Sequence, residues 1–231
     1  MIREAICTSV YFGAFLSLFA FYMGSLIQKK WKFGVFNPLL LSIVFVIVIL
    51  LVFHVDYDAY YTGAKYISYL LTPATVCLAV PLYEQLSALK KNVKAIFLGI
   101  LAGVFSSLGS ILAFSYMFGF SHTEYVTLLP KSITTAIGIG VAEELGGMPA
   151  VTVAVIILTG IFGNVIAGAV CGWFGIRHPV AKGLALGTSA HVIGTAKAFE
   201  MGETEGAMSS LAVAVAGLIT VAAAGIFAGF Y

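Results

Sequence analysis

The stretch LPKSITTAIG, residues 129–138, places a lysine, a serine and two threonines directly after a proline in an otherwise apolar chain. Proline suits the first turn of a helix, where its missing N–H costs no hydrogen bond. We therefore expect a short helix to begin at Pro130, at a depth where lipid would normally surround the chain. Irregular backbone is tolerated there only if protein or a water-filled cavity encloses it. The free N–H groups of that helix, beside the charge of Lys131, predict a site for a small carboxylate within a transport protein.

The composition indicates an integral membrane protein. Of the 231 residues, 61% are hydrophobic and 10% are charged, whereas soluble domains have about 25% charged residues. The net charge of +2 comes without a basic cluster that carries interleaved aromatics, so nothing points to nucleic acid. The three cysteines, Cys7, Cys77 and Cys171, lie in apolar runs, which favours buried free thiols over disulfides.

Six apolar runs predict an all-α polytopic membrane protein with about six transmembrane helices. The runs cover residues 5–27, 39–53, 66–83, 95–118, 150–174 and 207–230. Asn37 and Pro38 read as the N-cap and first residue of the second helix. In the third run, either a new helix begins at Pro73 or the prolines at 73 and 81 only kink a continuous helix, and both readings stay open. Residues 54–58, 119–125 and 202–206 read as loops or turns.

The fourth run carries small residues spaced four apart, Gly99 with Gly103 and Ser106 with Ser110. Residues at this spacing lie on one side of a helix. Small residues on one side let a neighbouring helix approach closely within a membrane. We therefore expect this face to pack against another helix.

Two stretches rich in polar residues, one beginning at Pro130 and one at Gly187, interrupt the apolar second half of the chain. The two stretches have the same order of features. Each has a small-polar segment, a glutamate, a glycine turn and then a long apolar helix. An offset of 57 residues aligns Ser132 with Ser189, Glu143 with Glu200, and Ala150 with Ala207. Paired interruptions of this kind point to the binding site of a transporter. We read the chain as one membrane domain, with spanning helices over residues 1–126 and candidate repeated units over residues 127–174 and 183–231.

The basic residues suggest how these units cross the membrane. The positive-inside rule places the lysines around residues 29–32 and 90–94, together with Arg177 and Lys182, on the cytoplasmic side. This requires the Pro130 stretch to enter the bilayer and return without crossing. If the Gly187 stretch does the same from the cytoplasmic side, the two broken helices are re-entrant from opposite sides and form an inverted repeat.

Several polar side chains in these stretches share helix faces. Lys131 and Thr135 are four apart, and Thr188, His191 and Thr195 follow a spacing of three and then four residues. A charge near the bilayer centre costs about 3 kcal/mol or more and is usually functional. A serine or threonine often bonds only its own helix, and His191 is as consistent with a core hydrogen bond as with a ligand or proton-carrying role.

Catalysis has little support in the sequence. Neither Gly-x-Ser-x-Gly, His-Glu-x-x-His nor a phosphate-cradling loop is present. An intramembrane hydrolase that pairs His191 with a serine is the remaining enzymatic alternative. We expect no enzyme activity, no metal and no cofactor.

The chain resembles the LrgB/CidB family of bacterial membrane proteins, which is also represented in the plastid glycolate/glycerate translocator. The resemblance covers nearly the whole chain. It rests on NPLL (37–40), LTPATV (71–76), AVPLYEQL (79–86), PKSITT (130–135), GGMPA (146–150), GTSAH (187–191), GTA (194–196) and EGAMSSL (205–211). One departure is Ala136, where the family often has a proline; alanine favours continuation of the helix.

The resemblance implies one of two functions in the bacterial plasma membrane. One is transport of small monocarboxylates such as pyruvate, glycolate or glycerate. The other is a holin-like or antiholin-like role that modulates murein hydrolase activity and lysis. It also implies a small LrgA/CidA-type membrane partner and an oligomer. A holin needs a pore but no paired helix breaks, so the sequence favours transport.

Together, the spacing and the resemblance give the candidate residues. Those for substrate binding are Lys131, Ser132, Thr134, Thr135, Thr188, Ser189, His191 and Thr195. Those for coupling or gating are Glu143, Lys197 and Glu200, and the expected helix breaks are Pro73, Pro81, Pro130 and Gly194.

Overall fold

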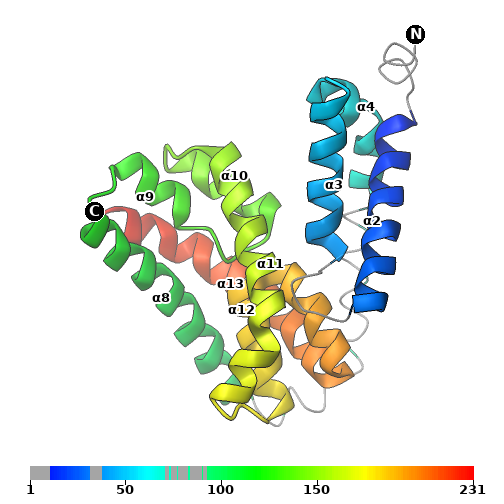
Figure 1. Ribbon diagram of the computed structural model, residues 1–231. Coiled ribbons are helices and arrows are strands. Elements are labelled where there is room, and N and C mark those ends of the chain that lie inside the picture. Colours follow the sequence, from blue (N-terminus) through cyan, green and yellow to red (C-terminus); the bar gives the residue numbers. More distant parts are fainter. Residues whose placement is uncertain are drawn as a thin grey trace. The chain divides into compact units, whose positions relative to one another are not determined.

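The computed structural model describes residues 11–31, 38–70, 73, 77, 83, 90 and 93–231, and the regular structure in these residues is helical (Figure 1). The chain forms two compact units, Met1–Cys77 and Leu78–Tyr231. Within the described residues, three helices are long and apolar enough to cross a membrane, and all three lie in the second unit. The expected all-α membrane fold is confirmed.

The first unit contains α2 (Phe12–Trp31), α3 (Pro38–Val52) and α4 (Tyr57–Ser68). Glycines bring α2 close to both neighbours: Gly13 lies against the backbone of Tyr60, and Gly24 against that of Pro38. The Ser17 and Tyr60 hydroxyls also share a 2.7 Å hydrogen bond. α3 matches the predicted second run and is a shorter apolar helix. The N-cap expected at Asn37 lies outside the described residues.

The helix α4 was not expected, because residues 54–58 read as an acidic, aromatic loop. It begins at Tyr57, where Tyr57 stacks on Tyr61 one helical turn later at 5.8 Å between ring centroids. Asp58 in the first turn also favours the positive end of the helix dipole. Most of the predicted third run, including Pro81, lies outside the described residues. Pro73 is helical, and the residues beside it lie outside that description.

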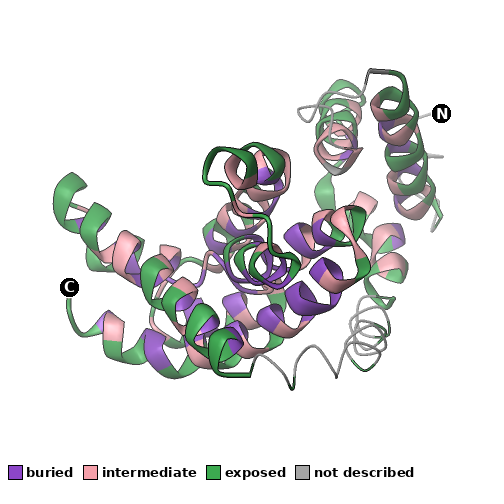
Figure 2. Cartoon of the chain, turned by 90° about the horizontal axis from the view of Figure 1, so that it is seen from below, coloured by how far each residue is buried: buried purple, intermediate pink, exposed green. Residues whose placement is uncertain are grey.

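The second unit contains α8 (Val93–Phe118), α9 (His122–Leu128), α10 (Thr135–Glu144), α11 (Pro149–Trp173), α12 (Pro179–Met201) and α13 (Glu203–Ala228). Buried residues concentrate where these helices face one another (Figure 2). α8 and α13 finish together, because Tyr116 donates to the Phe230 carbonyl at 2.6 Å and Tyr231 donates to that of Ser115 at 3.1 Å. We call this the Phe118 end of the unit, and the opposite one the Val93 end.

The helix α12 is a hairpin that enters and leaves at the Val93 end. Its backbone is non-helical at His191, with φ 42° and ψ −139°. Lys182 and Met201 line the same small cavity, whereas a straight helix at 1.5 Å per residue would separate them by about 28 Å. The first limb, residues 179–190, runs parallel to α13, because Gly183 touches Glu205 and Gly187 touches Ser209. The second limb, residues 192–201, returns to the start of α13.

The break in α12 therefore lies at His191 and not at Gly194, where it was expected. Gly194 has helical neighbours on both sides. A Cβ there would lie 2.7 Å from the Leu186 carbonyl oxygen and from the Ala190 Cβ. The glycine lets the two limbs approach each other closely.

The helices α9 and α10 form a second hairpin, which enters from the Phe118 end. The Tyr125 hydroxyl donates to the Phe227 carbonyl near the end of α13 at 2.8 Å. The chain returns to the level of α9, because the Met148 backbone N–H donates to Thr127 Oγ1 at 2.8 Å. The two hairpins thus enter the unit from opposite ends, as the basic residues predict. A repeat over residues 127–174 and 183–231 stays a prediction.

Three predicted boundaries are wrong. The helix after Pro130 begins at Thr135, because residues 129–133 form turns in which the Lys131 N–H donates to Leu128 and the Ile133 N–H to Pro130. Residues 119–125 are not all loop: α9 begins at His122, where Ser121 and Glu124 form a capping box, and these hydrogen bonds lower the pKa of the Glu124 carboxyl. The turn expected over residues 202–206 is limited to Gly202, because α13 already begins at Glu203. The acidic residues Glu203 and Glu205 favour the first turn of that helix.

The opposed hairpins give a prediction about sidedness. In a background without the native cysteines, His122→Cys and His178→Cys should react with a membrane-impermeant thiol reagent from opposite sides of sealed vesicles. The reason is that α9 starts at the Phe118 end and α12 at the Val93 end. Both histidines are exposed, so each variant should fold. Labelling of both positions from one side would contradict the arrangement.

Candidate functional site

A cavity of about 790 Å³ opens in the second unit between α8, the link between α9 and α10, and the first limb of α12. It extends from Lys131 and Ser132 to His178, an exposed residue at the Val93 end. Most of the lining residues have small side chains, and the hydroxyls of serine and threonine recur among them. The lining consists of Ala95, Gly99, Gly103, Ser106, Ser107, Ser110, Lys131, Ser132, His178, Val180, Ala181, Leu184, Ala185, Thr188 and Ser189. The basic loop around Arg177 and Lys182 adjoins this opening.

Lys131 is the cation of the cavity and lies on the link between the two limbs of the first hairpin. Its Nζ donates to the hydroxyls of Ser107 and Ser132, both at 3.1 Å, and these two hydroxyls are 3.0 Å apart. Among the described residues, no carboxylate lines the cavity and no ion pair includes Lys131. Two neutral hydroxyls solvate the ammonium but leave its charge uncompensated, so the cavity favours an anion.

The sequence did not single out Ser107. The predicted packing face of α8 does approach α12, since Gly103 leaves space for Thr188 and Gly99 for Leu184. The same stretch of α8 also faces the cavity through Ser106, Ser107 and Ser110. A serine in an apolar helix usually bonds its own backbone, and for this reason Ser107 carried no signal in the sequence.

Thr188 and Ser189 line the cavity opposite Lys131. Their hydroxyls donate to the backbone of their own helix, to the carbonyls of Leu184 at 2.8 Å and Ala185 at 2.6 Å. With the proton used in this way, each hydroxyl offers the cavity an acceptor oxygen. The α12 side therefore suits a hydroxyl or another donor on a ligand, and the α9–α10 side suits its negative charge.

His191 and Thr195 do not line the cavity; they hold the break in α12. His191 is 3% exposed, and its Nε2 lies 2.9 Å from the Ile156 carbonyl of α11. Because a carbonyl can only accept, Nε2 carries the proton. Thr195 Oγ1 donates to the His191 carbonyl at 3.0 Å and lies 2.8 Å from Ser209 Oγ on α13. These contacts link the break in α12 to α11 and α13.

The remaining candidates lie outside the cavity lining. Thr134 is the N-cap of α10 without a side-chain cap bond, and Thr135 is the first residue of that helix. Glu143 is exposed. Lys197 and Glu200 form a 2.7 Å ion pair on the surface of α12, and such exposed pairs contribute about 0–1 kcal/mol. Among the described residues, no group of three or more His, Cys, Asp or Glu side chains is placed to bind a metal.

The His191 contact gives a prediction about stability. A Cβ at Gly160 of α11 would lie 2.7 Å from His191 Cε1 and 2.8 Å from Nε2. Gly160→Ala should therefore displace the imidazole and destabilise the protein by about 1–3 kcal/mol, as overpacking does. The readout is thermal unfolding of the purified protein in detergent.

Gly109→Ala is the matched control, because a Cβ at this helical position meets nothing within 4 Å. Alanine is the better helix former by about 1 kcal/mol, so the control should be as stable as the parent protein or more stable. Equal melting temperatures for the two variants would contradict the prediction, because they would mean that the space around the His191 ring can accept a methyl group at position 160.

Comparison with known proteins identifies relatives along nearly the whole chain. Residues 17–230 match the LrgB-like family. The chain is 38% identical over 221 residues to proteins named "Antiholin-like protein LrgB" from Bacillus mycoides (strain KBAB4), Bacillus cereus (strain B4264) and Bacillus anthracis (strain CDC 684 / NRRL 3495). Each alignment covers 95% of this chain and 96% of the relative. No solved structure matches the chain significantly.

Proposed function

The chain belongs to the LrgB-like family, and we propose that it is a bacterial plasma-membrane transporter that binds a small monocarboxylate at Lys131. The observation that carries this proposal is the uncompensated ammonium group in a cavity without a carboxylate. An ammonium inside an apolar unit costs about 3 kcal/mol or more unless something offsets it. An anionic ligand offsets it directly.

The chemistry of the cavity favours one carboxylate with a neighbouring oxygen. One cation matches one negative charge, and the Thr188 and Ser189 oxygens can accept from a hydroxyl on the same molecule. Glycolate and glycerate fit this description, because each carries a hydroxyl group next to its carboxylate. The keto oxygen of pyruvate can only accept, so pyruvate would bind through the Lys131 side alone. In this scheme Ser107 and Ser132 hold the ammonium in position.

The two hairpins support transport rather than static binding. In many transporters, broken helices from two structural repeats meet at the substrate site. Here the link of one hairpin supplies Lys131, and the first limb of the other supplies Thr188 and Ser189. The basic residues near the Val93 end favour a cytoplasmic position for that opening.

Replacement of Lys131 tests the binding role. A charge-assisted hydrogen bond is worth roughly 1.5–3 kcal/mol, so Lys131→Met should weaken substrate binding about 10- to 150-fold. The methionine keeps the apolar stem and removes a charge from the membrane, so the variant should remain folded. Lys131→Arg should restore binding only in part, because the guanidinium presents its donors differently.

The measurements are affinity for labelled pyruvate, glycolate and glycerate in detergent, and uptake of the same acids into proteoliposomes. Lys30→Met is the matched control, since it removes an exposed lysine of α2 that is not a candidate site residue. Unchanged affinity in Lys131→Met, within twofold, would contradict the assignment of Lys131 to the substrate site.

An antiholin-like role is the second candidate function, and the names of the relatives favour it directly. In this proposal the protein works in an oligomer with a small LrgA/CidA-type membrane protein and modulates murein hydrolase activity. The two functions are compatible if control of lysis follows from transport.

Lys131→Met also separates these functions in cells. In a strain that lacks the native gene, we expect the parent protein to restore the normal rate of autolysis and the Met variant to fail, because both depend on the cavity. The readout is the fall in culture turbidity after detergent challenge, at matched protein levels. Full restoration by a transport-deficient Met variant would assign the antiholin role to another surface.

A further inference from the structure

A second cavity lies at the Val93 end of the second unit, where α11 ends and both limbs of α12 meet. It measures about 480 Å³, and its lining includes Gly168, Cys171, Arg177, Lys182 and Met201. None of these residues lines the cavity at Lys131. The second cavity is therefore a separate feature.

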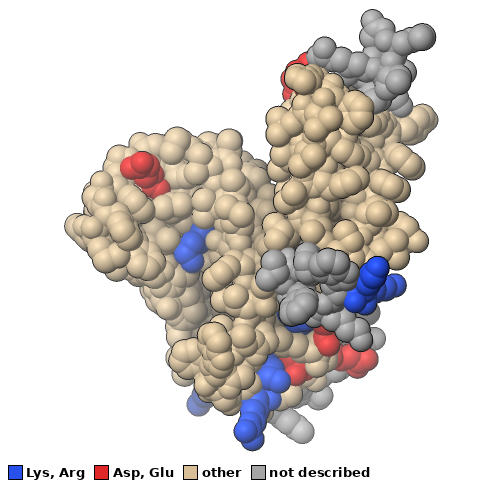
Figure 3. Space-filling model, in the orientation of Figure 1, with Lys and Arg blue, Asp and Glu red and all other residues tan. Residues whose placement is uncertain are grey.

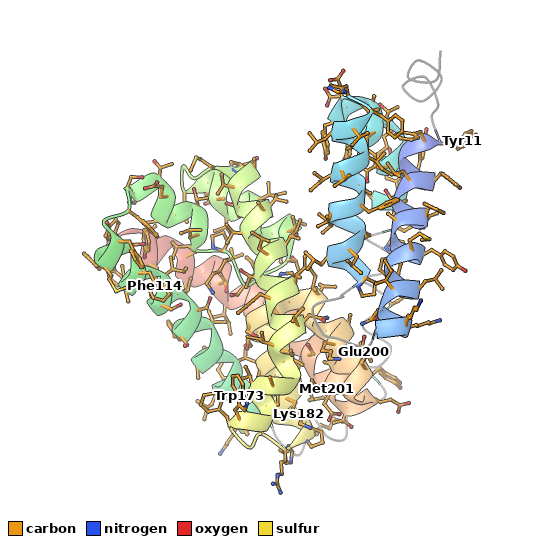
Figure 4. All side chains as sticks on the ribbon, in the orientation of Figure 1. Tyr11, Phe114, Trp173, Lys182, Glu200 and Met201 are labelled. Atoms are coloured by element: carbon orange, nitrogen blue, oxygen red, sulfur yellow. The ribbon has the colours of Figure 1, made fainter. Side chains whose placement is uncertain are left out.

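The position of this cavity matches the headgroup level of a membrane. α11 has 25 residues, which span about 37 Å at 1.5 Å per residue and exceed a hydrocarbon core of about 30 Å. The helix ends at Trp173, followed by Phe174, and these rings are 83% and 77% exposed. Such aromatics mark the membrane interface, so Arg177 and Lys182 follow at the depth of lipid phosphates. Figure 4 shows Trp173, Lys182 and Met201 at the same end of the unit.

The charge of the cavity is positive and uncompensated. In the described part of the chain, no carboxylate lines this cavity, and neither Arg177 nor Lys182 takes part in an ion pair. The nearby Glu200 is already paired with Lys197. Figure 3 shows several basic side chains at the lower end of this unit, with acidic side chains beside some of them.

The last carbonyl groups of α11 accept backbone hydrogen bonds, which reduces their repulsion of an anion. Free carbonyls at a helix C-terminus carry negative partial charge and would repel a phosphate. Here the Gly175 N–H donates to Gly172 and the Ile176 N–H donates to Cys171 at 2.8 Å. Gly175 has φ +63°, the left-handed conformation that this closure requires.

The other side of the cavity is apolar and continues along α11. A Cβ at Gly168 or Gly172 would meet nothing within 4 Å, so these glycines on successive turns leave an open slot beside the helix. Met201 and Cys171 supply the apolar wall. A basic mouth above an apolar slot matches a phosphate joined to hydrocarbon. A free phosphate would use only the basic mouth.

We propose that this cavity binds the headgroup phosphate of an anionic phospholipid, with Arg177 and Lys182 on the phosphate and an acyl chain along Gly168 and Gly172. Basic pockets between transmembrane helices on the cytoplasmic side bind such headgroups in other membrane proteins. A lipid here joins the end of α11 to both limbs of α12. The site is independent of the carboxylate site at Lys131.

The two tryptophans of the chain, Trp31 and Trp173, allow a direct test. Trp31→Phe leaves Trp173 as the only tryptophan, and bromine on lipid acyl chains quenches its fluorescence at short range. The protein is reconstituted into mixed phosphatidylcholine and phosphatidylglycerol vesicles, with the bromine carried by one lipid or the other at equal mole fraction. We expect brominated phosphatidylglycerol to quench more strongly.

The variant Arg177→Gln/Lys182→Gln should lose this preference. A basic residue near the membrane surface is worth about 1 kcal/mol toward an anionic lipid, which corresponds to about fivefold in relative affinity for each. Lys94→Gln, which removes an exposed lysine of the same unit that does not line the cavity, should keep the preference. Arg177→Lys/Lys182→Arg should also keep it, and this variant separates charge from folding.

Three results would overturn the proposal. Equal quenching by the two brominated lipids in the parent protein would mean that there is no anionic-lipid site. Equal loss of preference in Lys94→Gln would indicate general surface charge rather than this cavity. Abolition of the preference by soluble glycerol phosphate or inorganic phosphate at unchanged ionic strength would assign the cavity to a free phosphate.

Discussion

The second unit depends on how backbone polar groups are satisfied where two of its helices break. Inside a membrane, an unpaired N–H or C=O has no water to bind and costs several kcal/mol. At the first break, backbone turns close on Leu128 and Pro130, and Pro130 itself has no N–H to satisfy. At the second, the Thr195 hydroxyl donates to the His191 carbonyl, and the His191 ring contacts the Ile156 carbonyl of α11. The second break is buried in protein, whereas the first borders the cavity at Lys131.

The same constraint concentrates polar side chains at the breaks. Side chains that satisfy backbone groups must come from neighbouring helices, and those helices must approach closely. Glycines provide the approach: Gly183 and Gly187 admit the α13 backbone, and Gly160 admits the His191 ring. The hydroxyls, lysine and histidine of the two hairpins therefore lie within one small region. The cavity at Lys131 forms beside these groups.

The sequence predicted the long helices and the two broken stretches, because apolar length and paired polar interruptions are local signals. It also predicted four residues of the cavity: Lys131, Ser132, Thr188 and Ser189. It did not separate these from His191 and Thr195, since the spacing that placed Thr188, His191 and Thr195 on one face assumes a continuous helix. The positive φ at His191 redirects every residue after it. A single dihedral angle, set by packing against α11 and α13, decides which side chains reach the cavity.

The energetics of Lys131 favour a functional explanation of its place in the fold. Its two hydrogen bonds are to neutral hydroxyls, each worth about 1.5–3 kcal/mol because the donor is charged. Those bonds replace water but supply no counterion. An apolar residue of similar volume would fill the space without any desolvation cost, and buried charges replaced in this way often leave a protein equally or more stable. The fold therefore gains no evident stability from this ammonium. What the ammonium adds is a positive charge held at the link between two helices, facing a cavity that is open at one end.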